Sequence, residues 1–262
     1  MSSHLFYDGR PVKEILDHYV DKYNTKEFIS KDPISLPHAY SKGQDIEIVA
    51  FWTAMLSWGQ RATIINKSRA LFDMMGNAPH DFIVNHSDSD LKPFLDFKHR
   101  TFLADDTLTF IKAMQYIYKS HESMEDVFVN GQSLNDFDIK LSLVTFHNKF
   151  FNFEHHTPRT KKHVATPERG STCKRLNMFL RWMVRKDDRG VDFGLWKKIP
   201  SSALLIPYDL HVDRVSRRLG LVTRKQIDWS TVIQLTDILS KFDPIDPVKY
   251  DFALFGMGIL ED

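Results

Sequence analysis

Residues 170–180, Gly-Ser-Thr-Cys-Lys-Arg-Leu-Asn-Met-Phe-Leu, mark the point where a polar segment ends and an amphipathic helix begins. Ser171 or Thr172 is expected to cap this helix, which places Lys174 in its first turn. The positive end of the helix dipole destabilises a cation there and favours the neutral, nucleophilic amine. Such an amine can attack a sugar C1′ and form a Schiff base, so Lys174 is a candidate nucleophile. An exposed lysine on a basic helix would show the same pattern.

A second helix start lies in residues 206–214, Ile-Pro-Tyr-Asp-Leu-His-Val-Asp-Arg. Pro207 ends the preceding segment, and the helical spacing of apolar residues begins directly after Asp209, which predicts Asp209 as the N-cap. A carboxylate held at a helix start can stabilise an oxocarbenium ion or deprotonate a nucleophile, although capping alone also explains it. His211 and Asp213 are expected to pack, to form ion pairs or to support the site.

Most of the chain shows helical spacing of apolar residues and little strand-like alternation, which predicts an all-α fold. The spacing of apolar residues over positions 48–56 predicts a helix with one apolar face. The same spacing predicts further helices over residues 12–24, 107–120, 193–198 and from 210 onward. Asp105 or Asp106 would cap the second of these, and Gly220 would end the last. Residues 152–170 are expected to form a long loop.

Composition narrows the class of protein. The chain has 262 residues, 42% of them apolar and 26% charged, which is typical of a globular protein. Its single cysteine, Cys173, excludes an internal disulfide and an all-cysteine zinc or iron–sulfur site. No apolar run is long enough for a membrane span, and the first residues lack the apolar core of a signal peptide. We therefore expect a cytoplasmic protein without membrane contact.

Basic residues are concentrated although the formal net charge is only +1. Residues 159–189 contain ten Lys or Arg and three acids. A second basic cluster follows, made of Arg214, Arg217, Arg218, Arg224 and Lys225. A concentrated basic surface is what contacts with a phosphate backbone require, although a solvated helix face is the alternative.

The two helix starts resemble motifs of one family, the helix-hairpin-helix DNA glycosylases such as endonuclease III. In residues 170–180, Gly170, Lys174, Asn177 and Leu180 fall in register with the hairpin glycine, the catalytic lysine and the residues after it. Residues 207–220 resemble that family's Val-Asp-Thr-His-Val-x-Arg-Val block, in which the catalytic carboxylate aligns with Asp209.

Two further segments resemble the same family, in the same order. Residues 55–63, Met-Leu-Ser-Trp-Gly-Gln-Arg-Ala-Thr, are similar to the segment that fills the space left by an extruded base, with Gln60 as the candidate wedge. Residues 252–258, Phe-Ala-Leu-Phe-Gly-Met-Gly, resemble the closing helix. The chain is also similar to a bacterial family of unknown function that is related to these glycosylases, including the archaeal 8-oxoguanine type. It departs from the pattern at Thr172, where the family has a second hairpin glycine.

The resemblance implies an all-α fold of two helical lobes with a cleft between them. One lobe would comprise residues 1–44 and 166–262, and the other residues 45–165. The implied function is removal of a damaged base, such as an oxidised purine, through a Schiff base on Lys174 with Asp209 as the carboxylate, with strand cleavage as a further possibility. An aromatic residue such as Trp52, Trp58 or Trp182 would face the extruded base, although core packing is the favoured alternative for each of them.

The same resemblance implies a set of partners and contacts. Double-stranded DNA would be the partner of a monomeric, nucleoid-associated protein that needs no cofactor or metal. The residues expected to contact DNA are Gln60, Arg61, Gly170, Ser171, Thr172, Arg175, Arg214 and Arg218. His211 and Asn177 would support the site.

Two alternatives stay open from the sequence. One is a DNA-binding protein on the same fold without chemistry. The other is a metal-dependent phosphohydrolase that uses Asp209, His211 and Asp213. Further metal ligands would be His147, His155, His156 and His163. Residues i and i+2 of a helix do not face each other, which disfavours the metal site.

Overall fold

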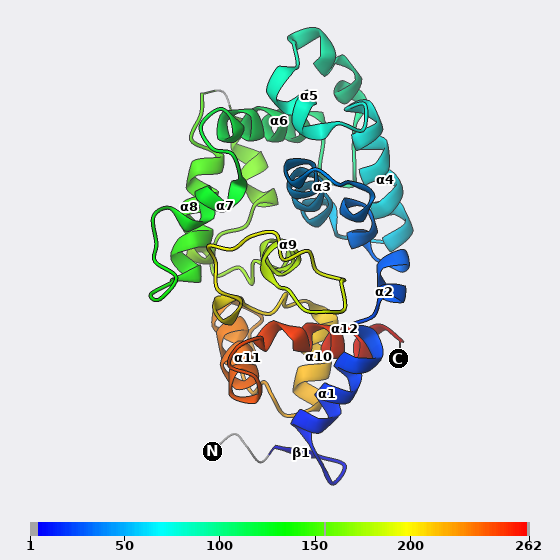
Figure 1. Ribbon diagram of the computed structural model, residues 1–262, viewed down its shortest axis with the longest axis vertical. Coiled ribbons are helices and arrows are strands. Elements are labelled where there is room, and N and C mark those ends of the chain that lie inside the picture. The colour runs from blue at the N-terminus through cyan, green and yellow to red at the C-terminus, as the bar shows by residue number, and fades with distance from the viewer. Residues whose placement is uncertain (1–4, 155, 261–262) are drawn as a thin grey trace. The chain divides into compact units, whose positions relative to one another are not determined.

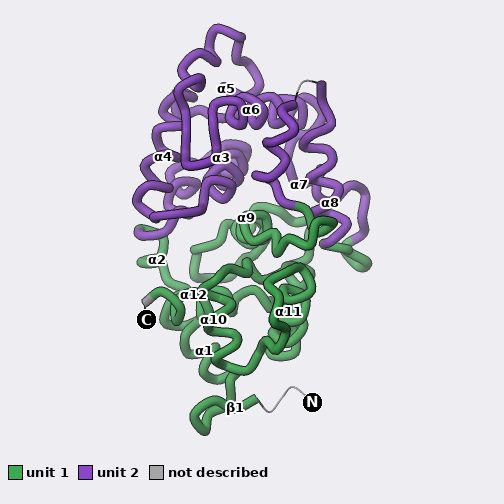
Figure 2. Tube along the Cα trace, turned by 180° about the vertical axis from the view of Figure 1, so that it is seen from behind, with its two compact units in different colours: residues 1–30, 134–139, 166–262 green, residues 31–133, 140–165 purple. Residues whose placement is uncertain are grey.

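The computed structural model describes residues 5–154 and 156–260, and the chain is mostly helical (Figure 1). It divides into two compact units, each built from separate stretches of sequence (Figure 2). Unit 1 comprises residues 1–30, 134–139 and 166–262, and unit 2 comprises residues 31–133 and 140–165. The first boundary therefore falls at residue 30 rather than 44, because the turns at residues 33–39 pack against the first helices of unit 2.

Unit 1 contains most of the sequence motifs. A hairpin of β1 (Phe6–Tyr7) and β2 (Arg10–Pro11) precedes its helices. They are α1 (Val12–Tyr23), α2 (Lys26–Lys31), α9 (Lys174–Val184), α10 (Leu210–Arg218), α11 (Trp229–Phe242) and α12 (Tyr250–Leu260). Short 3₁₀ turns lie at η5 (Pro167–Arg169), η6 (Ser201–Ala203) and η7 (Pro247–Lys249). Helices α1 and α10 both pack on α12 (Figure 1).

Two glycines of α12 explain that close packing. A Cβ on Gly256 would stand 2.1 Å from the ring of Tyr23 at the end of α1. A Cβ on Gly258 would stand 3.0 Å from Cβ of His211 in α10. The glycines of residues 252–258 therefore allow two helices to approach a third, which is the close-approach role that glycine fills best.

Unit 2 has five helices among its described residues, α3 (Gly43–Leu56), α4 (Arg61–Met74), α5 (Pro79–Asn85), α6 (Ala104–Tyr118) and α7 (Met124–Val129), together with nearly all of α8 (Ile139–Phe150). Its 3₁₀ segments are η1 (Pro33–Ser35), η2 (Pro37–Ala39), η3 (Asp88–Asp96) and η4 (Pro158–His163). Every residue of α3 from Ile46 to Leu56 is buried, so the prediction of one apolar face was wrong. A helix surrounded by others buries all its sides, and Phe51 contacts the rings of Phe110, Phe146 and Phe150.

Three local predictions differ from the structure. Residues 193–198 are irregular rather than helical. The predicted loop at residues 152–170 contains η4 and η5. Helix α6 begins at Ala104 and its N-cap is Leu103, so Asp105 and Asp106 lie inside the first turn, where the Asp106 carboxylate accepts from the Leu103 amide. None of the described helices has the length and apolar character needed to cross a membrane.

Asp106 ties the start of α6 to the turn of η4 inside unit 2. Its buried carboxylate accepts hydrogen bonds from the Leu103 amide (2.8 Å), Arg159 Nη1 (2.7 Å) and Thr160 Oγ1 (2.6 Å). His163 Nε2 lies 3.3 Å from the same carboxylate. Burial alone would raise the pKa of Asp106, but the adjacent His163 ring and the hydrogen bonds from Thr160 and Leu103 hold that pKa well below the ordinary value.

We expect Asp106→Asn to lower the free energy of unfolding by about 2 kcal/mol at neutral pH, because an amide cannot satisfy all these donors. Since the folded-state pKa is depressed, this stabilisation is present above the unfolded pKa of about 3.9 and is lost as the pH falls below it. Urea unfolding from neutral to acidic pH measures both effects. Asp105→Asn, exposed in the same turn, is the control and should change little; an equal loss in both variants would contradict the assignment.

Candidate functional site

The structure brings Lys174 and Asp209 together within unit 1. Lys174 is the first residue of α9, and Asp209 is the N-cap of α10. Their side chains meet at 3.7 Å between Nζ and Oδ2. The two side chains are 25% and 20% exposed, respectively. An amine and a carboxylate that are 35 residues apart in the chain therefore form a partly accessible pair at two adjoining helix starts.

Asp209 uses its two oxygens differently. Oδ1 accepts hydrogen bonds from the His211 amide (2.9 Å) and the Val212 amide (3.0 Å), which is the predicted N-cap. Oδ2 is the atom nearest the amine of Lys174. The cap fixes the carboxylate in one orientation, so one oxygen is held for the backbone while the other faces the amine.

The start of α9 differs from the prediction, because Cys173 rather than Ser171 or Thr172 is the N-cap. Cys173 has a left-handed backbone (φ +50°), and its thiol is buried, which raises the pKa of the thiol to about 12. Ser171 Oγ instead accepts from the Cys173 amide at 3.1 Å. The buried side chain of Cys173 makes no capping hydrogen bond to the first amides of α9.

Asn177 and Gly170 hold the turn that precedes Lys174. Asn177 is buried, and its Nδ2 donates to the carbonyl oxygen of Thr172 at 3.1 Å. Gly170 adopts a left-handed conformation (φ +70°) after η5, and its carbonyl accepts from the Trp229 amide at 3.0 Å. The three-residue 3₁₀ turn η5 therefore precedes residues 170–173, and the hydrogen bond to the Gly170 carbonyl holds the start of α11 against this turn.

Asp251 is a charged residue of this region that the sequence analysis missed. It lies buried in the first turn of α12 and accepts a hydrogen bond from Nη1 of Arg181. Burial raises the pKa of Asp251 to about 6. The positive charges of Arg181 and Lys174 oppose this rise, whereas the negative charge of Asp209 adds to it. Asp251 precedes the glycine-containing segment of α12, but nothing in its sequence context indicates that its carboxyl is buried.

His211 and Arg214 point to α12. His211 Nδ1 donates to the Gly258 carbonyl at 3.1 Å, and Arg214 Nη2 donates to the same oxygen at 2.6 Å. Asp213 instead accepts from the Tyr208 hydroxyl (2.6 Å) and pairs with Arg217. The candidate metal ligands of α10 therefore face different partners.

The histidines of the metal-site alternative are also separated by their contacts. His147 Nδ1 donates to the Val164 carbonyl at 2.7 Å, His163 contacts Asp106, and His156 Nδ1 donates to the Phe153 carbonyl at 3.1 Å. His155 lies outside the described residues. Within residues 5–154 and 156–260, no three His, Cys, Asp or Glu side chains are grouped to hold a metal ion.

The remaining predicted DNA contacts fall in two places. In unit 1, Arg214 and Arg218 are exposed on α10, whereas Arg175 is partly buried, and burial lowers its pKa to about 10. In unit 2, the exposed Gln60 is the N-cap of α4 and Arg61 is its first helical residue. Gln60 and Arg61 thus stand at a helix start of their own.

Several arginines of the two basic clusters form ion pairs with aspartates of the chain. Arg181 and Arg185 are buried, and Arg185 pairs with Asp187, Asp192 and Asp246. Arg159 pairs with Asp106, Arg189 with Asp21, Arg217 with Asp213, and Arg224 with Asp228. A count of charges along the sequence does not reveal these partners, and the buried Arg181 and Arg185 do not contribute to a basic surface.

Two of the tryptophans predicted to face a base are in the core. Trp52 and Trp182 are fully buried. Trp58 is partly exposed and contacts the rings of His99 and His163. Core packing therefore explains Trp52 and Trp182.

Comparison with protein families found a match over residues 32–260 to the family described as protein of unknown function (DUF2400). Neither the search of curated proteins nor the search of solved structures found a match. The matched range includes Lys174, Asp209 and Asp251.

We expect that substitutions can separate the capping hydrogen bonds of Asp209 from the negative charge of its carboxylate. Asp209→Asn should keep the stability of the protein, because asparagine caps helices as well as aspartate does, whereas Asp209→Ala should cost about 1 kcal/mol. Thermal and urea unfolding measure the difference. Asp228, the N-cap of α11, is the matched site, so Asp228→Ala should cost a similar amount. A large destabilisation by Asp209→Asn would show that the pair with Lys174 is mainly structural.

Proposed function

We propose that this chain, which belongs to the DUF2400 family of proteins of unknown function, is a DNA glycosylase that acts through Lys174 and Asp209. The observation that carries the proposal is the 3.7 Å approach of the lysine amine to a carboxylate whose orientation is fixed by capping. A nucleophile beside an oriented acid–base group is the arrangement that covalent catalysis requires. The resemblance of both helix starts to the glycosylase motifs supports the same assignment.

The proposed reaction begins with a damaged nucleotide turned out of the duplex, at a cost of roughly a few kcal/mol. Asp209 accepts a proton from the ammonium of Lys174, and the neutral amine attacks the sugar C1′. The bond from C1′ to the base breaks, and the base leaves with the bonding electrons and takes up a proton. That proton comes from Asp209, and the carboxylate so restored stabilises the positive charge that develops on the sugar.

The covalent product would be a Schiff base between Lys174 Nζ and the ring-opened sugar. Loss of a proton from C2′ would then release the 3′ phosphate by β-elimination and cut the strand. Hydrolysis of the imine would return the amine of Lys174. Both side chains are partly exposed, which gives a sugar access to them without local unfolding.

Contacts with the DNA backbone are proposed for the starts of α9 and α10. The Cys173 side chain makes no capping hydrogen bond at the start of α9, and a helix N-terminus suits a phosphate. Arg214 and Arg218 are exposed on the neighbouring helix. These groups would hold the backbone on either side of the lysine.

A DNA-binding protein without chemistry is the second candidate function. Thr172 stands where the glycosylase family has its second hairpin glycine, and the segment before the hairpin is a 3₁₀ turn. Both features change how closely a phosphate can approach the turn. Salt-sensitive DNA binding with no base release and no covalent adduct, across a broad panel of lesions, would select this candidate.

Borohydride trapping tests the proposed nucleophile. We expect a covalent adduct between the protein and duplexes that contain an abasic site or an oxidised base, because reduction converts the imine to a stable amine. Lys174→Gln should abolish the adduct, and Asp209→Asn should reduce its rate by at least about a hundredfold. Lys241→Gln, which alters an exposed lysine of α11, is the matched control. An adduct that survives Lys174→Gln would remove the assignment.

Salt dependence tests the proposed backbone contacts. Removing one phosphate contact by Arg218→Gln should weaken binding to duplex DNA of any sequence and reduce the slope of log Kd against log salt by about 1. Fluorescence anisotropy over a range of salt concentrations measures both quantities. Lys241→Gln should leave the slope unchanged, and an equal change in the two variants would argue against a specific role of α10.

A further inference from the structure

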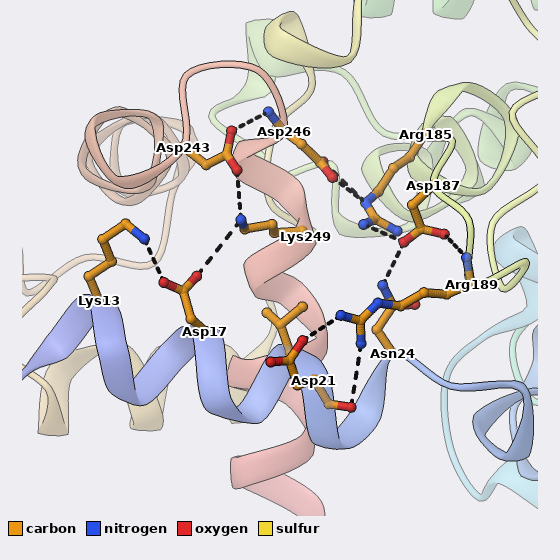
Figure 3. A pocket seen from close by; sticks show the side chains of 11 residues that line it. Lys13, Asp17, Asp21, Asn24, Arg185, Asp187, Arg189, Asp243, Asp246 and Lys249 are labelled. Carbon is orange, nitrogen blue, oxygen red and sulfur yellow. Dashed lines mark hydrogen bonds and ion pairs between the residues drawn. The ribbon is translucent and has the colours of Figure 1, made fainter.

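Unit 1 contains a polar cavity of about 440 Å³, within the size range of small-ligand sites (Figure 3). Its walls come from α1, the segment after α9, the turn after α11, and η7. Five carboxylates line it, on Asp17, Asp21, Asp187, Asp243 and Asp246. Four basic side chains also line it, so the lining carries one more negative than positive charge.

Each basic side chain of the cavity already has an aspartate partner. Lys13 Nζ lies 2.5 Å from Asp17, and Lys249 Nζ lies 2.6 Å from Asp243. The two arginines pair with the other three aspartates (Figure 3). An anion would have to displace these carboxylates, whereas a cation would add to them.

Asn24 supplies the acceptor that points to a ligand. The residue is 1% exposed and lines the cavity. Its Nδ2 donates to Asp187 Oδ2 at 2.7 Å, and since a carboxylate only accepts, this bond fixes the amide orientation. The opposite atom, Oδ1, is buried and has no hydrogen-bond partner among the described residues. An unpaired buried acceptor is costly, so a donor is expected there.

Burial at this cavity also affects a carboxyl of the lining. Burial raises the pKa of Asp246, and Arg185 opposes the rise without cancelling it. A further cation in the cavity would stabilise the ionised form of this carboxyl. The excess of carboxylates and the unpaired amide oxygen therefore favour the same ligand chemistry, a positively charged hydrogen-bond donor.

We propose that this cavity binds a small organic ammonium ion, whose N–H groups donate to Asn24 Oδ1 and to the lining carboxylates. The proposal is independent of the glycosylase function, because the cavity lining does not include Lys174 or Asp209. The ion pairs could instead serve only to hold α1 to the neighbouring turns, which requires no ligand. Absence of diamine binding in the experiment below would show that case.

Isothermal titration calorimetry of the DNA-free protein with 1,4-diaminobutane tests the proposal. Tetramethylammonium has the charge but no N–H donor, and inorganic phosphate has the opposite charge; both are titrated at equal ionic strength. We expect saturable binding of the diamine alone. Absence of saturable diamine binding, equal binding of tetramethylammonium, or binding of phosphate in its place would overturn the proposal.

Variants locate the site. Asn24→Leu should weaken diamine binding about tenfold, because it removes a hydrogen bond to a charged donor. Asn85→Leu is the matched control, since Asn85 also donates to an aspartate but lies on α5, away from the cavity. Asp21→Asn, at an exposed position of the lining, covers the case in which Asn24→Leu does not fold, and should weaken binding severalfold. Unchanged binding in the folded variants would overturn the proposal.

Discussion

Two buried arginines on one helix constrain the arrangement of unit 1. A buried guanidinium without a carboxylate costs several kcal/mol, so Arg181 in the last turn of α9 and Arg185, the C-cap of α9, must reach their partners in any folded state. Arg181 reaches Asp192 and Asp251, and both guanidinium groups lie over the ring of Phe252. These contacts join the last turns of α9 to the start of α12 and to the segment that follows α9.

This constraint also positions the candidate site. Once the end of α9 is held against α12, the direction of the helix determines where its first residue, Lys174, lies. Helix α10 packs on α12 through Gly258, and this packing determines where its N-cap, Asp209, lies. The amine and the carboxylate therefore meet because two helices share α12 as a neighbour. Asp251 belongs to the same network, since its carboxyl is paired to Arg181 and influenced by Lys174 and Asp209.

Local sequence patterns predicted the features that depend on local physics. The bounds of α1 and the start of α10 follow from apolar spacing and proline, and the N-cap role of Asp209 follows from its place before Leu210. Burial of α3 on all sides was not predicted, because one-face spacing cannot show how many neighbours a helix has. The cap of α9 was also missed, since a left-handed Cys173 depends on burial of its thiol rather than on propensity.

The sequence by itself determined that the chain is mostly helical, that a helix begins directly after Asp209, and which residue types stand near the starts of α9 and α10. Only the tertiary structure decided which charges meet. Arg181 and Asp251 are 70 residues apart, and the carboxylates around Asn24 come from segments at both ends of the chain. Pairing of this kind depends on distance in space and on exclusion of water, and neither quantity is encoded in the order of neighbouring residues.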